Sequence, residues 1–160
     1  MGSTFTVYLP LSDGFAPKNE KIQKKIPPGT GTILLVDDEL DLVEAMAEMI
    51  GLLGYKTIAT SPSEEALTIF KDNPEKIDMA IIDMDMPGFN GLELSKAFRG
   101  DRPELPIILC TGYDLRQWDL QHEEAPLFNQ VLRKPIAFKH LAEVVHGAFH
   151  SATNKKSPEP

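Results

Sequence analysis

The chain of 160 residues is 42% hydrophobic, which is enough to bury the core of one domain flanked by tails. Its formal net charge of -8 would repel nucleic acid phosphates, so we expect no nucleic acid partner. No apolar stretch approaches the roughly 20 residues that a membrane span requires, and no signal peptide pattern follows Met1. The composition therefore predicts a cytoplasmic protein that makes no membrane contact through these residues.

The two ends of the chain lack the periodicity of packed elements. Residues 11–31 are rich in Pro, Lys, Gly and Asn, which is typical of a linker. Residues 151–160 are too polar to bury and predict a disordered tail. The folded domain is therefore expected over residues 32–150.

Between these ends, short apolar runs alternate with helical patterns. Strands are predicted near 32–37, 55–60, 77–82, 106–110 and 128–133. Helices are predicted over 42–53, 61–72, 91–99, 114–124, where the apolar stripe is poorest, and 138–148. Such runs are typical of parallel strands buried on both faces, and right-handed crossovers would place helices on both sides. The pattern predicts an α/β fold built on a five-stranded parallel sheet.

Polar residues stand where four of the predicted strands end. They are Asp37 and Asp38, Asp83, Thr111 and Lys134. Because ligands bind at the carboxyl ends of strands in open parallel sheets, these five side chains should meet at one edge. Taken singly, each has a simpler interpretation, since acidic residues favour helix starts and the others are common at turns and strand ends. All four strand ends nevertheless carry polar groups, and the negative aspartates are complemented by a positive lysine. This combination favours a functional site.

The four histidines give no comparable signal. His122, His140, His146 and His150 lie on helical or terminal stretches without a metal-ligand spacing. We therefore expect them to be solvated.

Four motifs contain the five polar residues and their neighbours. They are Ile-Leu-Leu-Val-Asp-Asp-Glu at 33–39, Asp-Met-Ala-Ile-Ile-Asp-Met-Asp-Met-Pro-Gly-Phe-Asn-Gly at 78–91, Pro-Ile-Ile-Leu-Cys-Thr-Gly at 106–112 and Arg-Lys-Pro at 133–135. In this order and spacing, over about residues 31–150, they resemble the receiver domain of two-component response regulators. The resemblance implies a flavodoxin-like, doubly wound (βα)5 fold with strand order 2-1-3-4-5. It also implies phosphorelay signalling, in which a histidine kinase or histidine phosphotransfer domain phosphorylates Asp83 in the presence of Mg²⁺.

The resemblance gives each polar residue a role. Mg²⁺ would be bound directly by Asp38 and Asp83, largely through water by Asp37, and by the backbone carbonyl of Asp85. Asp83 would accept the phosphoryl group as a nucleophile, Lys134 would bind one phosphoryl oxygen, and the Thr111 hydroxyl would donate to another. Chemistry of this kind depends mostly on positioning and charge stabilisation. Whether phosphorylation drives homodimer formation is left open.

Some positions depart from the usual pattern of the family. Many receivers have Tyr or Phe three positions before the lysine, where this chain has Val131, so we expect phosphorylation to be read out differently. Asp85 and Tyr113 would face the attacking water, and they should tune the lifetime of the phosphorylated state.

Residues 1–10 carry a second resemblance. The segment Gly-Ser-Thr-Phe-Thr-Val-Tyr-Leu-Pro at 2–10 is similar to the final strand of histidine kinase ATP-binding domains. A kinase strand, a linker and a receiver in that order imply the C-terminal receiver of a hybrid histidine kinase. The parent kinase could itself be anchored in a membrane, and these residues contain no kinase active site.

A metal-dependent phosphohydrolase of the haloacid dehalogenase type is the competing interpretation. Such enzymes also form an aspartyl phosphate, and their Asp-x-Asp motif matches Asp83-Met84-Asp85. Their motif normally ends the first strand and continues to Thr, whereas here an Asp pair ends an earlier strand and Met-Pro follows. A third interpretation, a degenerate receiver that serves only as an interaction module, is disfavoured by the complete set of five polar residues.

Overall fold

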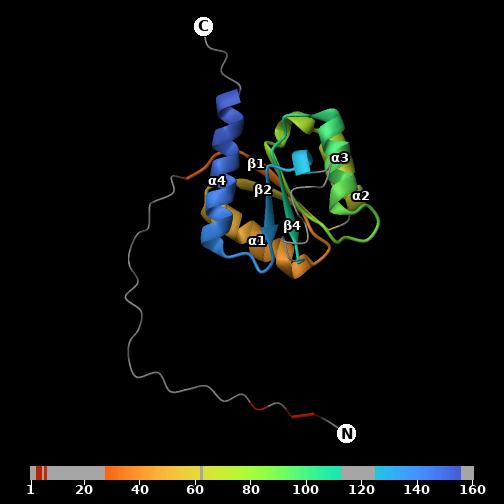
Figure 1. The fold of residues 1–160 in the computed structure, drawn as a ribbon, viewed down its shortest axis with the longest axis vertical. Helices are drawn as coiled ribbons and strands as arrows, with labels where there is room; N and C mark the ends of the chain where they lie inside the picture. Colours follow the sequence, from red (N-terminus) through yellow and green to blue (C-terminus); the bar gives the residue numbers. More distant parts are fainter. Residues whose placement is uncertain (1–2, 5, 7–27, 62, 113–124, 156–160) are drawn as a thin grey trace.

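Strands and helices alternate along the chain in the computed structural model (Figure 1), which describes residues 3–4, 6, 28–61, 63–112 and 125–155. The strands are β1 (Thr32–Val36), β2 (Lys56–Thr60), β3 (Met79–Asp83), β4 (Ile107–Thr111) and β5 (Gln130–Arg133). The α-helices are α1 (Leu40–Leu52), α2 (Ser63–Asp72), α3 (Gly91–Asp101) and α4 (Phe138–Lys155), and short 3₁₀ helices cover Pro74–Lys76 and Ala125–Leu127. All the predicted strands are confirmed, with ends that differ from the prediction by no more than two residues.

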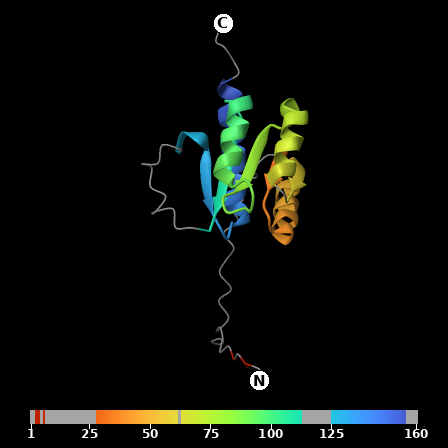
Figure 2. The same ribbon diagram turned by 90° about the vertical axis from the view of Figure 1, so that its right-hand side faces the viewer.

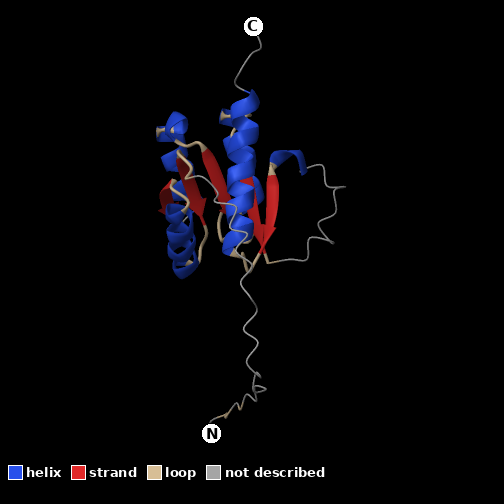
Figure 3. Ribbon diagram, turned by 90° about the vertical axis from the view of Figure 1, so that its left-hand side faces the viewer, coloured by secondary structure: helices blue, strands red, loops and turns tan. Residues whose placement is uncertain are grey.

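The strands form one parallel sheet in the order β2-β1-β3-β4-β5, as predicted. β1 pairs with β2 and β3, and β4 pairs with β3 and β5, in parallel each time. Figure 3 shows the strand arrows side by side and pointing the same way. The ends of β1, β3, β4 and β5, at Val36, Asp83, Thr111 and Arg133, therefore lie at one edge of the sheet, which we call the carboxyl edge.

Helices cover both faces of the sheet and create two hydrophobic cores. On β1, Ile33 and Leu35 pack in the core beneath α1 and α4, whereas Leu34 and Val36 pack in the core beneath α2 and α3. Figures 1 and 2 show these two pairs of helices on opposite sides of the sheet, with α2 and α3 side by side. Successive side chains of a strand point to opposite faces, so the strands of a sheet covered on both sides are apolar along their length. Polar residues therefore come at the strand ends.

The last helix is longer than predicted. α4 continues to Lys155, so the tail expected from residue 151 begins as helix. Phe149 stacks on Tyr55 with ring centroids 4.6 Å apart, and the Ser151 hydroxyl donates to the Gly147 carbonyl at 3.0 Å. These contacts stabilise α4 beyond residue 148, where its predicted apolar face ends. Even with this extension, the described ranges include no helix that is long and apolar enough to cross a membrane.

Part of the predicted linker contacts the domain. The Gly29 amide donates to the Leu53 carbonyl at 2.8 Å, and the Lys56 amide donates to the Gly31 carbonyl at 2.9 Å. These bonds join residues 28–31 to the chain around the start of β2. The helix predicted at 114–124 and most of the kinase-like segment at 1–10 lie outside the described residues.

Candidate functional site

Three aspartates meet at the carboxyl edge. One carboxylate oxygen from each of Asp37, Asp38 and Asp83 lies within 4.8 Å of the others. Asp37 is 1% and Asp83 is 5% exposed, whereas Asp38 is open to solvent. The cluster therefore has two buried carboxylates and one that a partner or ion can reach from outside.

Lys134 supplies positive charge between the two buried carboxylates. Its Nζ lies 2.7 Å from Oδ2 of Asp37 and 2.6 Å from Oδ1 of Asp83. Burial alone would lower the pKa of Lys134, but its hydrogen bonds to both aspartates and their negative charges outweigh burial and raise the pKa to about 12. The lysine is therefore charged at neutral pH and holds the two carboxylates together.

Backbone amides complete the surroundings of these carboxylates. The Glu39 amide donates to Oδ1 of Asp37, and the Asp85 amide donates to Oδ2 of Asp83, each at 3.0 Å. Each buried carboxylate thus has one oxygen on Lys134 and the other on the backbone, which fixes its orientation.

Thr111 and Lys134 come to the site from adjacent strands. Thr111 ends β4 and is fully buried, and its carbonyl accepts from the Lys134 amide at 2.8 Å. This bond continues the pairing of β4 with β5 and places Lys134 directly beyond the end of β5. The preceding residue, Cys110, is buried, and burial raises the pKa of its thiol to about 12, so it is a packing group.

The start of α3 shapes the loop that follows Asp83. Asn90 and Glu93 form a capping box, in which the Glu93 amide donates to Asn90 Oδ1 at 2.9 Å and the Asn90 amide donates to Glu93 Oε2 at 3.1 Å. Gly91 lies so close to β3 that a Cβ there would overlap the Asp83 carbonyl oxygen. The missing side chain at residue 91 is therefore what allows α3 to begin against the end of β3.

We expect Gly91→Ala to lower the free energy of unfolding by about 1–3 kcal/mol, the usual cost of overpacking. The added methyl group would push α3 away from β3 and disturb the position of Asp83. Thermal unfolding measures the effect, and Gly100→Ala is the matched control in the same helix, because a Cβ there meets no atom within 4 Å. Equal melting temperatures for Gly91→Ala and the wild-type protein would contradict the close approach.

One residue that shapes the site was missed by sequence analysis. Ser63, at the start of α2, is buried, and its hydroxyl oxygen accepts from the Phe89 amide at 3.1 Å. This bond ties the loop between β3 and α3 to a helix 26 residues earlier in the chain. A serine at a helix start ordinarily suggests a cap, so no local pattern indicated this contact.

The positions that depart from the family pattern have different surroundings. Val131 is half-buried and packs against the core beneath α2 and α3. Asp85 has an exposed side chain beyond the end of β3. Tyr113 lies outside the described residues. The expected influence of Asp85 and Tyr113 on the phosphoryl lifetime stays a prediction.

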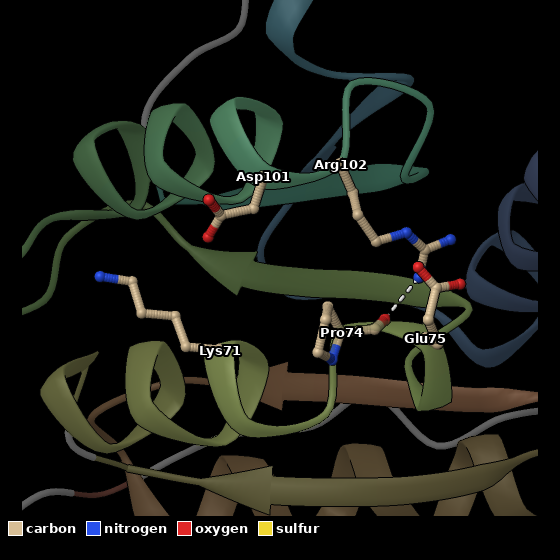
Figure 4. A pocket seen from close by; sticks show the side chains of 5 residues that line it. All are labelled: Lys71, Pro74, Glu75, Asp101 and Arg102. Carbon is tan, nitrogen blue, oxygen red and sulfur yellow. Dashed lines mark hydrogen bonds between the residues drawn. The ribbon is translucent and has the colours of Figure 1, made fainter.

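A hollow lies near the opposite edge of the sheet. Its lining comes from the ends of α2 and α3 and from the 3₁₀ helix between them, and it consists of Lys71, Pro74, Glu75, Asp101 and Arg102 (Figure 4). The Arg102 guanidinium donates to the carbonyls of Pro74 and Ile77 at 2.5 and 2.6 Å and pairs with Glu104 at 3.2 Å. Its charge joins neighbouring segments of the chain, so we assign this hollow no function.

The donor atoms at the carboxyl edge suit a hard divalent cation. Carboxylate oxygens within 4.8 Å of one another, one of them on an exposed residue, match the oxygen ligands of ions such as Mg²⁺ that keep several waters. Lys134 adds a positive charge that can bind an anionic group beside such an ion. The site can therefore hold a divalent metal ion and an anion together.

The chain matches the family model of the response regulator receiver domain over residues 33–146. Sensor kinase CckA of Brucella abortus is 28% identical over 153 residues, which cover 90% of this chain and 16% of the kinase. Sensor protein TorS of Escherichia coli is 23% identical over 145 residues, which cover 91% of this chain and 16% of that protein. These alignments cover most of this chain. They cover only about a fifth or less of each curated relative.

The response regulator protein TrrA from Thermotoga maritima, solved in complex with Mg²⁺ and BeF, is similar in structure. It superposes with a TM-score of 0.66 and 31% identity, over 74% of this chain and 98% of that chain. The family match includes all five polar residues at the strand ends, which decides against the phosphohydrolase interpretation. By its strand order, its clustered aspartates and this match, the chain belongs to the response regulator receiver domain family of two-component signalling.

Proposed function

We propose that Asp83 accepts a phosphoryl group from a phosphohistidine. The observation that carries this proposal is the placement of the Asp83 carboxylate, buried at the end of the central strand β3 between Lys134 and the Asp85 amide. A carboxylate held in this way keeps its oxygens oriented for attack on phosphorus. The Lys134 ammonium beside it can then bind an oxygen of the incoming phosphoryl group. The similarity to TrrA, which was solved in complex with Mg²⁺ and BeF, supports this proposal.

A divalent metal ion, which we take to be Mg²⁺, would be held by Asp38, by Asp83 and by the backbone carbonyl of Asp85. Asp37 would act largely through water, and it would also keep Lys134 in place through their contact at 2.7 Å. When bound, Mg²⁺ supplies positive charge that offsets the carboxylates and the phosphoryl oxygens. Three aspartates within 4.8 Å would otherwise oppose the approach of an anionic donor.

The residues of the chain then carry out the transfer. An oxygen of Asp83 attacks the phosphorus, the nitrogen–phosphorus bond of the donor breaks, and the leaving imidazole keeps the electron pair. Lys134 exchanges its contact with Asp83 for one with a phosphoryl oxygen and keeps Asp37 as its second partner. The Thr111 hydroxyl donates to another phosphoryl oxygen. Positioning and charge stabilisation account for the rate, so no general base is required.

The phosphodonor in this proposal is a protein, either a histidine kinase or a histidine phosphotransfer domain. Three large apolar side chains are exposed around the carboxyl edge: Leu40 at the start of α1, Phe89 in the loop after β3 and Phe138 at the start of α4. Exposed apolar side chains around a charged site are typical of a surface that contacts another protein. A cytoplasmic location, where ATP-dependent kinases act, fits such a donor.

Incubation with acetyl phosphate and Mg²⁺, followed by measurement of the intact mass, tests this function. A receiver should accumulate one labile phosphoryl group per chain, and chelation of Mg²⁺ should prevent its formation. Continuous release of inorganic phosphate without an adduct would instead indicate a phosphohydrolase. A complete lack of reaction would indicate an interaction module.

We further propose that the chain is the C-terminal receiver of a hybrid histidine kinase. An alignment that covers 90% of 160 residues spans about 144 residues, so the match to CckA begins no later than about residue 17. It therefore extends upstream of the family match at 33–146 and into the predicted linker. This similarity to a sensor kinase, together with the kinase-like motif at 2–10, supports the proposed origin.

Deleting residues 1–27 should leave phosphorylation unchanged and alter the free energy of unfolding by less than about 1 kcal/mol. The reason is that this segment would belong to a preceding domain. Deleting residues 1–31 is the matched comparison, because it also removes the hydrogen bonds of Gly29 and Gly31 to Leu53 and Lys56. Thermal unfolding should show a larger loss for this longer deletion. A drop of about ten degrees or more after the shorter deletion would show that residues 1–27 belong to the receiver.

A further inference from the structure

We propose that His146 and His150 on α4 form a second metal site, which takes a transition metal ion such as Zn²⁺. The two residues are one helical turn apart, and their Nε2 atoms lie 2.9 Å from each other. The rings meet edge to face, with centroids 4.2 Å apart. Residues four apart on a helix lie on one face, so the two side chains meet although the sequence analysis predicted them to be solvated.

The observed geometry is close to that of a bidentate chelate. Two Zn–N bonds of about 2.0–2.1 Å at a tetrahedral angle place the nitrogens about 3.3 Å apart. The two Nε2 atoms now share a hydrogen bond at 2.9 Å, and an ion between them would replace this bond. Water molecules would complete the coordination of the ion.

The chemistry of the ligands separates this site from the aspartate cluster. Imidazole nitrogen suits Zn²⁺, Cu²⁺ and Ni²⁺, whereas carboxylate oxygen suits Mg²⁺. The two ends of the molecule would therefore select different ions.

Packing of the residues between the two histidines fixes this turn of α4. Ala148, between the two histidines, is buried in the core beneath α1 and α4, and Phe149 stacks on Tyr55. His146 is half-buried, whereas His150 is exposed, so an ion can approach from solvent. A helix turn that is fixed before the ion arrives keeps the two imidazoles near each other at little further cost in backbone entropy.

The site is a feature of this chain rather than of the family match. That match ends at residue 146, so His150 stands one turn beyond it. An ion held by both rings would join two successive turns of α4 and stabilise the helix where it continues past the matched region.

Calorimetric titration of Zn²⁺ into the full chain without a histidine tag tests this site, with excess Mg²⁺ present to occupy the aspartates. One ion per chain is expected. His146→Ala and His150→Ala should each weaken binding by about 100-fold, because the remaining imidazole loses the chelate effect. His140→Ala is the matched control, since His140 is exposed on the same helix, and this variant should bind Zn²⁺ like the wild-type protein.

Two further measurements make the result decisive. Amide hydrogen exchange over residues 147–155 should slow when Zn²⁺ is added to the wild-type protein and stay unchanged in His150→Ala. Phosphorylation of His150→Ala by acetyl phosphate should be normal, which shows that the variant is folded. Unaltered Zn²⁺ affinity in His150→Ala, or equal weakening in His140→Ala, would overturn the proposal without affecting the role of Asp83.

Discussion

Asp83→Asn should abolish phosphorylation by acetyl phosphate while the domain stays folded. The amide has nearly the shape of the carboxylate but no anionic oxygen to attack phosphorus. Lys134 would keep its 2.7 Å contact with Asp37, so its charge remains paired in the variant. The free energy of unfolding should therefore change by no more than about 1 kcal/mol. Intact mass after incubation with acetyl phosphate and Mg²⁺ measures the loss of the adduct.

Asp85→Asn is the matched control for this substitution. Asp85 lies two residues further along the chain with an exposed side chain, and its proposed metal ligand is the backbone carbonyl, which the substitution preserves. The control should still be phosphorylated, with an altered lifetime. A stable adduct of undiminished yield in Asp83→Asn would exclude Asp83 as the phosphoacceptor.

Lys134→Ala should cause the largest loss of stability of any substitution at the site. It leaves the carboxylates of Asp37 and Asp83, 1% and 5% exposed, without the cation between them. Removing one partner of a buried ion pair typically costs about 3–5 kcal/mol, because the remaining charge is uncompensated. Added Mg²⁺ should restore part of the loss, since it brings positive charge back to the same carboxylates. Urea unfolding with and without Mg²⁺ measures both effects.

Lys139→Ala provides the comparison for Lys134→Ala. Lys139 pairs with Glu143 at 3.9 Å on the surface of α4, and the two side chains are 84% and 56% exposed. Loss of an exposed pair of this kind should change the free energy of unfolding by less than about 1 kcal/mol. If the two lysine variants unfold at the same urea concentration, the ion pairs at the carboxyl edge contribute little to stability.

The sheet could be predicted because the apolar runs of its central strands fit few structures other than buried parallel strands. β3 and β4 are buried at every position and apolar up to their last residue, a pattern that strands covered on both faces require. A polar residue that ends such a run must stand at the carboxyl edge, which is why Asp83 and Thr111 could be assigned to one site.

Contacts between residues far apart in the chain could not be predicted in the same way. That Lys134 contacts Asp37 and Asp83 depends on how far its side chain reaches across the sheet. The stack of Phe149 on Tyr55, which accompanies the extension of α4, joins residues on different elements. No local periodicity encodes either contact, so the pairing within the site and the true end of α4 required the structure.

Both ends of the folded domain leave it on the side away from the aspartates. Gly29 and Gly31 precede β1 beside the start of β2, and Phe149, near the end of α4, stacks on Tyr55, which also precedes β2. Whatever is attached before residue 28 or after residue 155 is thus tethered at the pole remote from the acidic cluster. A partner protein can therefore approach the carboxyl edge from the side opposite to both points where the chain enters and leaves the domain.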